Sequence, residues 1–388
     1  MPSFSLRRGA SLAVLLSAML LASCETPPEP EPPAPPPPPP PVPAVMLNSG
    51  IADAAATYVS FIRDVRTLQP GFQSEMAIQE AMRRGSAWAP EQLSRGMIAY
   101  GAVIALQSQD FVSGVRTYAA DEATRRNVID QIVRDPAYAA QLPGAAEAAG
   151  MVTQTLNQDF VAIAAIGQAM EEDAYTIQER DDPRRSWAVQ HIADRESRLE
   201  AVRSAGGNPM LPSATEAARL LAAGNDGTGL GLGTARKGPP YTPAVVRSLA
   251  IAALSALGAG GEDWRANHLA LTVEQNNEFC LTMSKLNLYQ CLAASRPHYE
   301  DMFCAGRHVV KDIATCSSAA VGPGPTPIAI PGMTTAPNPG SAGAPVTTES
   351  LNAAPVAPPA AGPVPPEGRP AEPAVPSSNA VPYQPGPN

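Results

Sequence analysis

The stretch "CLAASRPHYEDMFC", residues 291–304, decides how the C-terminal part of the chain folds. It begins and ends with a cysteine, and two more cysteines flank it, Cys280 upstream and Cys316 downstream. Apolar residues at helical spacing lie on both sides of Arg296-Pro297, where a helix does not readily continue. We therefore predict two helices that form a hairpin. Their expected apolar linings are Val273, Phe279, Leu281, Met283, Leu286 and Leu288 in the first helix, and Phe303, Val309, Val310 and Ile313 in the second.

Helix geometry selects one of the three disulfide pairings that four cysteines allow. Within one helix, 11 residues span about 16 Å, whereas a disulfide needs Cα atoms within about 7 Å. Facing residues of an antiparallel hairpin have a constant index sum. That sum is 596 for Cys280 with Cys316 and nearly the same, 595, for Cys291 with Cys304. The crossed pairing gives 584 and 607, which one hairpin cannot satisfy. The nested disulfides Cys280–Cys316 and Cys291–Cys304 are therefore predicted, around a turn near residue 298.

This arrangement resembles the coiled-coil-helix-coiled-coil-helix architecture, in which twin helices with Cys-x₉-Cys spacing are joined by nested disulfides. The resemblance covers about 40 residues, and the spacings here are ten and eleven intervening residues, so it implies a similar architecture and not ancestry. The longer spacing turns Cys316 about 120° away from the face of Cys304 on a regular helix. We therefore expect Cys316 at or past a frayed helix end. Glu300 and Asp301 fall in the first turn of the second helix, where carboxylates favour the helix dipole.

The alternative to the disulfides is a zinc site, because cysteine and histidine are the preferred zinc ligands. Its ligands would be Cys291, His298, Cys304 and His308. The disulfide prediction is preferred because it uses all four cysteines, and no metal or cofactor is predicted. Two other histidines, His191 and His268, lie alone among helical residues and are expected to be surface or capping groups.

The N-terminus has the pattern of an export signal. Residues 1–24 read "MPSFSLRRGASLAVLLSAMLLASC", with two arginines before an apolar run from Ala10 to Ala22. That run is shorter than the roughly 20 apolar residues that span a bilayer, so it predicts a signal peptide. The end of the run, Leu21-Ala22-Ser23-Cys24, resembles the lipobox of bacterial lipoproteins. An ordinary secretion signal with a chance cysteine is the alternative.

The lipoprotein resemblance implies that residues 1–23 are removed and that Cys24 becomes an acylated N-terminus, with fatty acids such as palmitate on its sulfur. Several acyl chains hold a protein to a membrane far more firmly than one chain does. Glu25 follows the cysteine, in place of the Asp that retains enterobacterial lipoproteins in the inner membrane. We therefore expect a lipid anchor in the bacterial outer membrane, facing the periplasm.

Proline-rich segments flank the foldable chain. Residues 24–46 contain "ETPPEPEPPAPPPPPPPVP", which favours polyproline II and predicts a semi-rigid arm of roughly 60 Å. Residues 321–388 are almost entirely Pro, Ala, Gly, Ser, Thr and Val, and such a composition predicts a disordered tail.

The chain between these segments is expected to be all-α, a helical bundle with the disulfide hairpin at its C-terminal end. Residues 47–205 and 243–320 show helical apolar periodicity, and 206–242 is expected to be a flexible Gly/Pro-rich loop. A heptad pattern in the first part predicts a long helix that packs antiparallel with the next one, which runs from Trp187 to Val202. The heptad positions are Leu156, Ile163, Met170 and Ile177.

Composition limits the possible functions. The formal net charge is −9 and no basic face is evident, so nucleic acid is not an expected partner. The Gly-rich segment 224–240 lacks the spacing of the dinucleotide and phosphate-loop patterns. No catalytic residues are predicted, because Glu171, Glu172 and Asp173 are expected on a solvent-facing side of a helix without a partner group.

The sequence therefore favours a structural or interaction role in the cell envelope. We expect an adaptor or scaffold that reaches the membrane through its lipid anchor and binds an envelope protein or peptidoglycan. The alternative is an envelope enzyme acting on peptidoglycan or other glycans, which would need paired carboxylates in a cleft.

Overall fold

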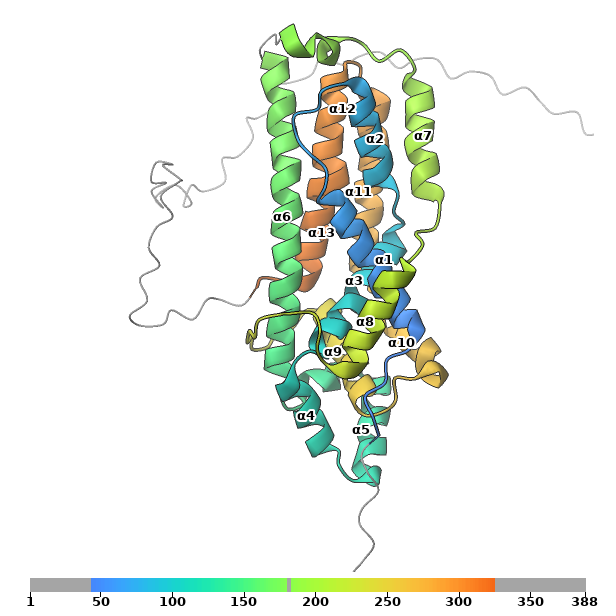
Figure 1. Cartoon of the computed structure of the whole chain (residues 1–388), viewed down its shortest axis with the longest axis vertical. Coiled ribbons are helices and arrows are strands. Elements are labelled where there is room, and N and C mark those ends of the chain that lie inside the picture. Colours follow the sequence, from blue (N-terminus) through green and yellow to red (C-terminus); the bar gives the residue numbers. More distant parts are fainter. Residues whose placement is uncertain (1–42, 180–182, 325–388) are drawn as a thin grey trace, which may run out of the picture. The chain divides into compact units, whose positions relative to one another are not determined.

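The computed structural model describes residues 43–179 and 183–324 (Figure 1). The predicted signal peptide, Cys24, most of the proline arm and the tail beyond residue 324 lie outside the described residues. Within the described part of the chain, no helix combines the length and the apolar character needed to cross a membrane.

The described residues form an all-α bundle, and the structure places no strand among them. The α-helices are α1 (Ser49–Val65), α2 (Glu75–Ser86), α3 (Pro90–Ala105), α4 (Gln109–Tyr118), α5 (Glu122–Arg134), α6 (Ala145–Glu179), α7 (Arg195–Gly207), α8 (Ala214–Asp226), α9 (Pro243–Ala256), α10 (Arg265–Leu271), α11 (Gln275–Ala294), α12 (His298–Cys304) and α13 (Asp312–Val321). Short 3₁₀ segments are η1 (Pro136–Gln141), η2 (Pro183–Val189) and η3 (Glu262–Trp264), and η4 (Ala305–Lys311) is a π-helix.

One core runs through both expected helical parts. Helices α3 and α9 lie at its centre, and α9 is apolar and buried along most of its length, as expected for an internal helix. Helix α3 also contacts α1 and α6, so residues 47–205 and 243–320 share a single set of buried side chains. The bundle is thus continuous across the segment 206–242.

Residues 206–242 were expected to be a flexible loop, but part of this segment forms the helix α8. The Ser213 hydroxyl accepts a hydrogen bond from the Glu216 backbone N–H and begins the helix, and Gly227 ends it with a φ of 65°. A Ser-x-x-Glu pattern is a helix-start signal, so the sequence did contain the evidence for α8.

The apolar residues that follow Pro90 are divided between two helices. Leu93, Met97 and Ile104 are buried on α3, which ends at Ala105, and Phe111 is buried on α4. The division falls where the Ser108 side chain accepts a hydrogen bond from the Phe111 backbone N–H and caps the new helix.

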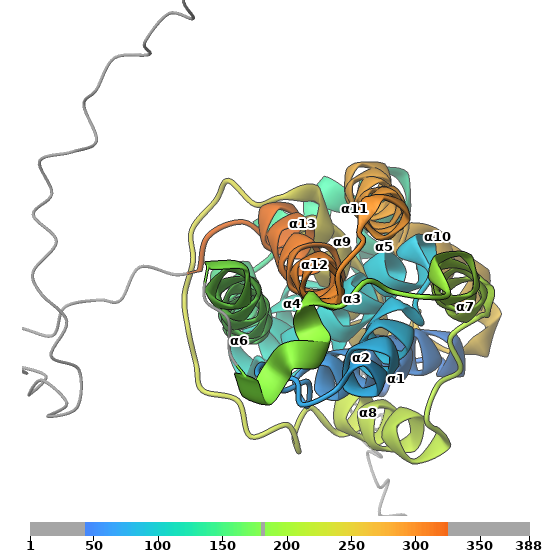
Figure 2. The same ribbon diagram turned by 90° about the horizontal axis from the view of Figure 1, so that it is seen from above.

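Helices α6 and α7 were expected to pack antiparallel, but they do not pack against each other. The 35 residues of α6 correspond to about 52 Å, and its heptad residues are buried as expected. The heptad face contacts α12, η4 and α13, whereas α7 packs on α2 and α11. Figures 1 and 2 show α6 and α7 on opposite sides of the bundle. The 3₁₀ segment η2 separates the two helices along the chain, so α7 is not restricted to a neighbouring position.

Helix α6 and the π-helix η4 meet at a pair of glycines. A Cβ added to Gly167 would lie 2.7 Å from the Gly306 carbonyl oxygen, and a Cβ added to Gly306 would lie 2.7 Å from the Gly167 carbonyl oxygen. The two backbones are therefore in direct contact, and neither position has room for a side chain.

The segment that leads into α1 is fixed to the base of the bundle. The backbone N–H groups of residues 46, 47 and 49 and the Asn48 side-chain amide donate hydrogen bonds to four separate places. The N–H of Met46 donates to Ser255 O at 3.1 Å, and the N–H of Leu47 donates to Asn225 Oδ1 at 2.8 Å. The N–H of Ser49 donates to Glu262 Oε1 at 2.7 Å, and the Asn48 amide donates to Gly260 O at 3.0 Å. We call residues 43–49 the entry segment.

We predict that Gly167→Ala lowers the free energy of unfolding by about 1–3 kcal/mol, because the new methyl group meets a backbone oxygen that cannot move independently. Gly306→Ala should have an effect of similar size, since the contact is reciprocal. Urea unfolding followed by circular dichroism measures both. Gly207→Ala is the control, because no atom lies within 4 Å of its Cβ position and alanine is the better helix former. Equal stability of Gly167→Ala and wild type would contradict the glycine contact.

Candidate functional site

Two disulfides join α11 to the helix formed by α12, η4 and α13. Their Cα–Cα distances are 5.7 Å for Cys280–Cys316 and 5.8 Å for Cys291–Cys304, which is the usual range. The pairing is the nested one that the index sum predicts, and the turn lies between Ala294 and His298.

The residues of the alternative zinc site are engaged in other interactions. The Cys291 and Cys304 sulfurs are bonded to each other, so neither is a thiolate ligand. His298 Nε2 lies 3.0 Å from the Glu75 carboxylate, and His308 Nδ1 lies 2.8 Å from the Asp312 carboxylate. Among the described residues, no three His, Cys, Asp or Glu side chains form a group that could hold a metal ion.

Cys316 does not lie at a frayed helix end, and that expectation was wrong. It lies within α13 and is 5% exposed. The reason is the π-helix η4, in which each residue advances about 80° around the axis instead of about 100°. Over the 7 residues of η4, the total rotation around the helix axis is roughly 130° smaller than in an α-helix. This difference cancels the offset of about 120°, so Cys316 lies on the same face as Cys304. Ser284 on α11 donates a 3.1 Å hydrogen bond to the His308 carbonyl within η4.

The acidic residues of α6 diverge, and one of them is buried, contrary to expectation. Glu171 is 5% exposed and accepts a 3.0 Å hydrogen bond from Lys311 Nζ on η4. Glu172 is exposed, and Asp173 forms an ion pair of 2.6 Å with Arg185. The three carboxylates therefore have separate surroundings and form no acid pair. Glu171 was misplaced because its partner, Lys311, is 140 residues away in the sequence.

Both histidines were expected to be surface or capping groups; His191 is exposed, whereas His268 is fully buried and is therefore not a surface group. The Asn48 side-chain Nδ2 lies 3.2 Å from His268 Nδ1, and His268 Nε2 lies 3.0 Å from the Ala259 carbonyl oxygen. An amide nitrogen donates and a carbonyl accepts, so this ring is neutral with its proton on Nε2. Burial lowers the pKa of His268 to about 4, and the hydrogen bond to Ala259 offsets part of that effect. The ring thereby links the entry segment to the loop before α10.

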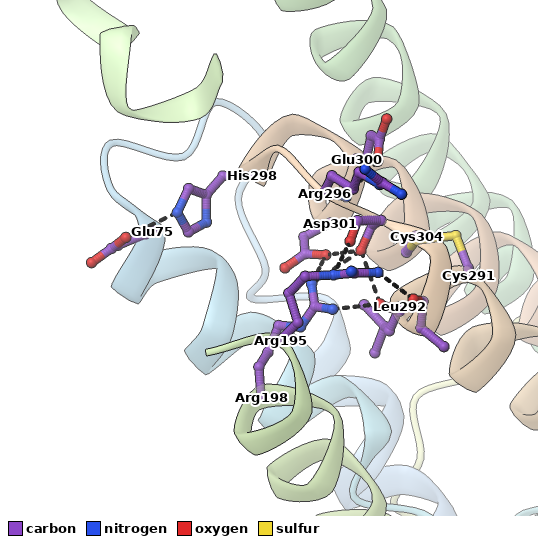
Figure 3. A network of polar contacts seen from close by, with 12 residues as sticks. Glu75, Arg195, Arg198, Cys291, Leu292, Arg296, His298, Glu300, Asp301 and Cys304 are labelled. Carbon is purple, nitrogen blue, oxygen red and sulfur yellow. Dashed lines mark hydrogen bonds and ion pairs between the residues drawn. A yellow bond between two sulfur atoms is a disulfide. The ribbon is translucent and has the colours of Figure 1, made fainter. Parts of the chain in front are cut away.

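An ion pair is buried at the tip of the hairpin, where α7 meets the turn between α11 and α12 (Figure 3). Arg198 on α7 contacts the Asp301 carboxylate, and both side chains are almost completely buried. The Ser295 hydroxyl accepts a 3.0 Å hydrogen bond from Arg198 Nη1 and donates one of 2.6 Å to Asp301 Oδ1. Asp301 Oδ2 has no hydrogen-bond partner among the described residues.

The same arginines complete the C-terminal end of α11. The last carbonyl groups of a helix have no partner within it. Arg198 donates to the Leu292 carbonyl, and Arg195 donates to the carbonyls of Ala293 and Ser295, the latter at 2.8 Å. The two arginines of α7 thus hold this helix to the hairpin by donating charged hydrogen bonds to carbonyl oxygens at the end of α11 (Figure 3).

The electrostatics of this cluster are those of a structural pair. Burial raises the pKa of Asp301, and the Arg198 guanidinium offsets part of that rise. Raised carboxylate pKa values also occur in active sites. Here the carboxylate is enclosed by Arg198 and Ser295, so it has no access to a substrate.

Four of the hollows among the described residues are candidate active sites. Each is lined by at most one carboxylate: Glu274 in a hollow of about 190 Å³, Glu300 in one of about 170 Å³, and Glu80 in one of about 410 Å³. Glu274 caps α11 and Glu80 pairs with Arg83. The fourth has a volume of about 610 Å³ and no ionisable side chain in its lining.

That fourth hollow is an apolar groove between α6 and α13, which we call the α6–α13 groove. Its lining consists of Phe160, Val161, Ala164, Ala314, Thr315, Ser318, Ala319, Gly322 and Pro323. Val161 is 70% exposed at the edge of this groove.

Helix α11 differs from expectation in which of its apolar residues are buried. Leu281 and Leu288 lie in the core, whereas Phe279, Met283 and Leu286 are exposed. The helix is apolar on two faces, so periodicity in the sequence did not distinguish them.

Comparison of the chain with known protein families, curated proteins and solved structures found no match.

We predict that Arg198→Leu lowers the free energy of unfolding by about 3–5 kcal/mol, because it leaves the Asp301 carboxylate buried without its cation. The double variant Arg198→Leu/Asp301→Leu should be more stable than Arg198→Leu, since it removes the unpaired charge as well. Urea unfolding of the three proteins measures the coupling. Arg83→Leu removes one partner of an exposed pair and should change stability little. Additive effects of the two substitutions would contradict the pairing.

Acid should weaken the wild type through His268. The folded pKa, about 4, lies below the ordinary value of 6.5, so the unfolded state binds more protons between those two pH values. The free energy of unfolding therefore falls as the pH falls from 6.5 to 4, by up to roughly 3 kcal/mol from this residue.

The measurement is the pH dependence of stability in His268→Gln against wild type. The variant should lack that part of the dependence, because glutamine does not titrate. His191→Gln, a change at an exposed residue, should leave the wild-type dependence intact. The same pH dependence in all three proteins would rule out a titrating, buried His268.

Proposed function

We propose that the protein is a lipid-anchored envelope adaptor that binds an envelope protein or peptidoglycan through the α6–α13 groove. The observation that carries the proposal is the groove itself, which is open, about 610 Å³ in volume and free of ionisable side chains. Concave surfaces lined mainly by apolar side chains are frequent binding sites. Its outer rim includes the exposed Val161, at a place where a partner's apolar side chain would be sheltered from water.

The membrane part of the proposal depends on the sequence. The basic Arg7-Arg8 pair, the short apolar run and the Leu21-Ala22-Ser23-Cys24 ending support signal cleavage and acylation at Cys24. Glu25 supports an outer-membrane location, with the folded part facing the periplasm. Disulfides in the hairpin agree with an oxidising compartment.

The second candidate function is an envelope enzyme acting on peptidoglycan or other glycans. Glycan hydrolysis ordinarily uses two carboxyl groups that face each other across a cleft. Each of these four hollows carries at most one carboxylate, which supports the adaptor over the enzyme.

Acylation predicts that the mature N-terminus is a di- or triacylated Cys24, which mass spectrometry of the purified protein detects. Cys24→Ser should move the protein from the membrane fraction to the soluble periplasmic fraction. An unmodified cysteine, or cleavage at another position, would exclude the anchor.

Binding is tested by Val161→Asp, which places a charge in the α6–α13 groove. Wild-type protein extracted in detergent should co-purify with an envelope protein or with purified sacculi, and the variant should lose at least tenfold of that binding. Val133→Asp is the matched control, because Val133 is an exposed valine on α5, outside the groove. Equal binding by the two variants would exclude the groove. Turnover of peptidoglycan fragments by a protein that binds no partner would favour the enzyme.

A further inference from the structure

The outward face of α11 carries no formal charge. Its exposed residues are Gln275, Asn276, Phe279, Met283, Leu286, Gln290, Ala293 and Ala294. A surface helix ordinarily presents charged side chains to water. Phe279, Met283 and Leu286 instead expose 67%, 40% and 45% of their surfaces, at the i, i+4, i+7 spacing that places them in one line. We call these three residues the α11 ridge.

The bundle itself does not account for the ridge. The core side of α11 is filled by other residues, including Leu281, Leu288 and Leu292. The charged residues of the helix have partners inside the protein: Glu278 pairs with Arg95 at 2.9 Å, and Lys285 is buried against main-chain carbonyls. Figure 2 shows α11 at the edge of the bundle, where its outward face is accessible.

The ridge is complementary to itself. When a helix pairs with an antiparallel copy, facing residues again have a constant index sum. The sum is 566 for Met283 with its counterpart and 565 for Phe279 with Leu286. It is 566 for Asn276 with Gln290, so two amides that can hydrogen-bond each other close both ends of the apolar line. A twofold interface needs one patch in which every residue meets a suitable partner from the same patch.

From this arrangement we propose that the α11 ridge is a dimer interface, occupied by the ridge of a second copy of this chain in antiparallel orientation. The absence of charge on the face fits a second uncharged face, because a charged partner would lose its hydration without gaining a counterion. This inference is independent of the proposed envelope role and of the α6–α13 groove.

The exposed area of the ridge is small for a stable dimer interface. Taking about 200 Å² for a fully exposed large apolar side chain, the ridge exposes on the order of 300 Å² per copy, or 600 Å² for a pair. Stable interfaces bury at least roughly 1,200 Å². The dimer is therefore weak in dilute solution and forms at high local concentration, which calls for a covalent trap.

The test is disulfide trapping in the full-length chain at about 100 μM protein, where a weak interface is populated. Met283→Cys lies on the twofold axis, so two copies should be joined by a bond between their residues 283 on mild oxidation. Gln290→Cys alone should not be joined, because its two copies lie about 21 Å apart along the antiparallel pair. In a mixture of Asn276→Cys and Gln290→Cys chains, residue 276 of one chain should form a disulfide with residue 290 of the other.

Two controls keep the result specific. Adding Leu286→Glu to Met283→Cys should slow trapping at least tenfold, and peptide mapping should show both native disulfides unchanged. Sedimentation of the wild type at the same concentration should show a dimer that Leu286→Glu loses. The proposal is overturned if Met283→Cys chains are not joined and the wild type sediments as a monomer. It is also overturned if Gln290→Cys is joined to itself, which indicates parallel pairing, or if Met283→Cys in membranes is bonded to another protein.

Discussion

The contact between Gly167 and Gly306 is the constraint on which the C-terminal architecture depends. It brings the backbone of α6 against η4, and the disulfides fix α11 to the other side of the same helix. The π-helix, which has more residues per turn than an α-helix, allows the glycine contact and the Cys280–Cys316 disulfide to form together. It turns Cys316 toward Cys280 while Gly306 faces α6. A regular α-helix from 298 to 321 could satisfy one of these contacts but not both.

Buried charge in this protein is concentrated where helices begin, end or cross. Arg198 and Arg195 supply hydrogen bonds to the end of α11, and Glu171 holds Lys311 beside the glycine contact. Lys285 donates to the carbonyls of Trp88 and Gly206, and burial lowers its pKa to about 8. The helices contribute few aromatic side chains and pack largely through small ones. Contacts between small apolar side chains do not fix how a helix is rotated, so these buried charged groups help to orient the helices.

Helical content and the disulfide pairing could be predicted because both follow from local spacing. Periodicity identifies helices, and a proline midway between cysteines leaves one pairing that a hairpin can accommodate. The packing partner of α6 could not be predicted, since its heptad face would fit any apolar helix of suitable length. Likewise, Glu171 and the α11 ridge were misplaced because burial depends on residues far away in the sequence. The α6–α13 groove has no local signal, for it exists only once two distant helices lie side by side.

The entry segment has a mechanical consequence. In a chain held by an N-terminal anchor, tension would reach the folded part at residues 43–49. The hydrogen bonds there lead to α8, α9 and the loop before α10, so the load is divided among several elements. Resistance to pulling is governed by the rate of unfolding rather than by equilibrium stability. A force applied on the N-terminal side of the entry segment would therefore have to break several contacts together.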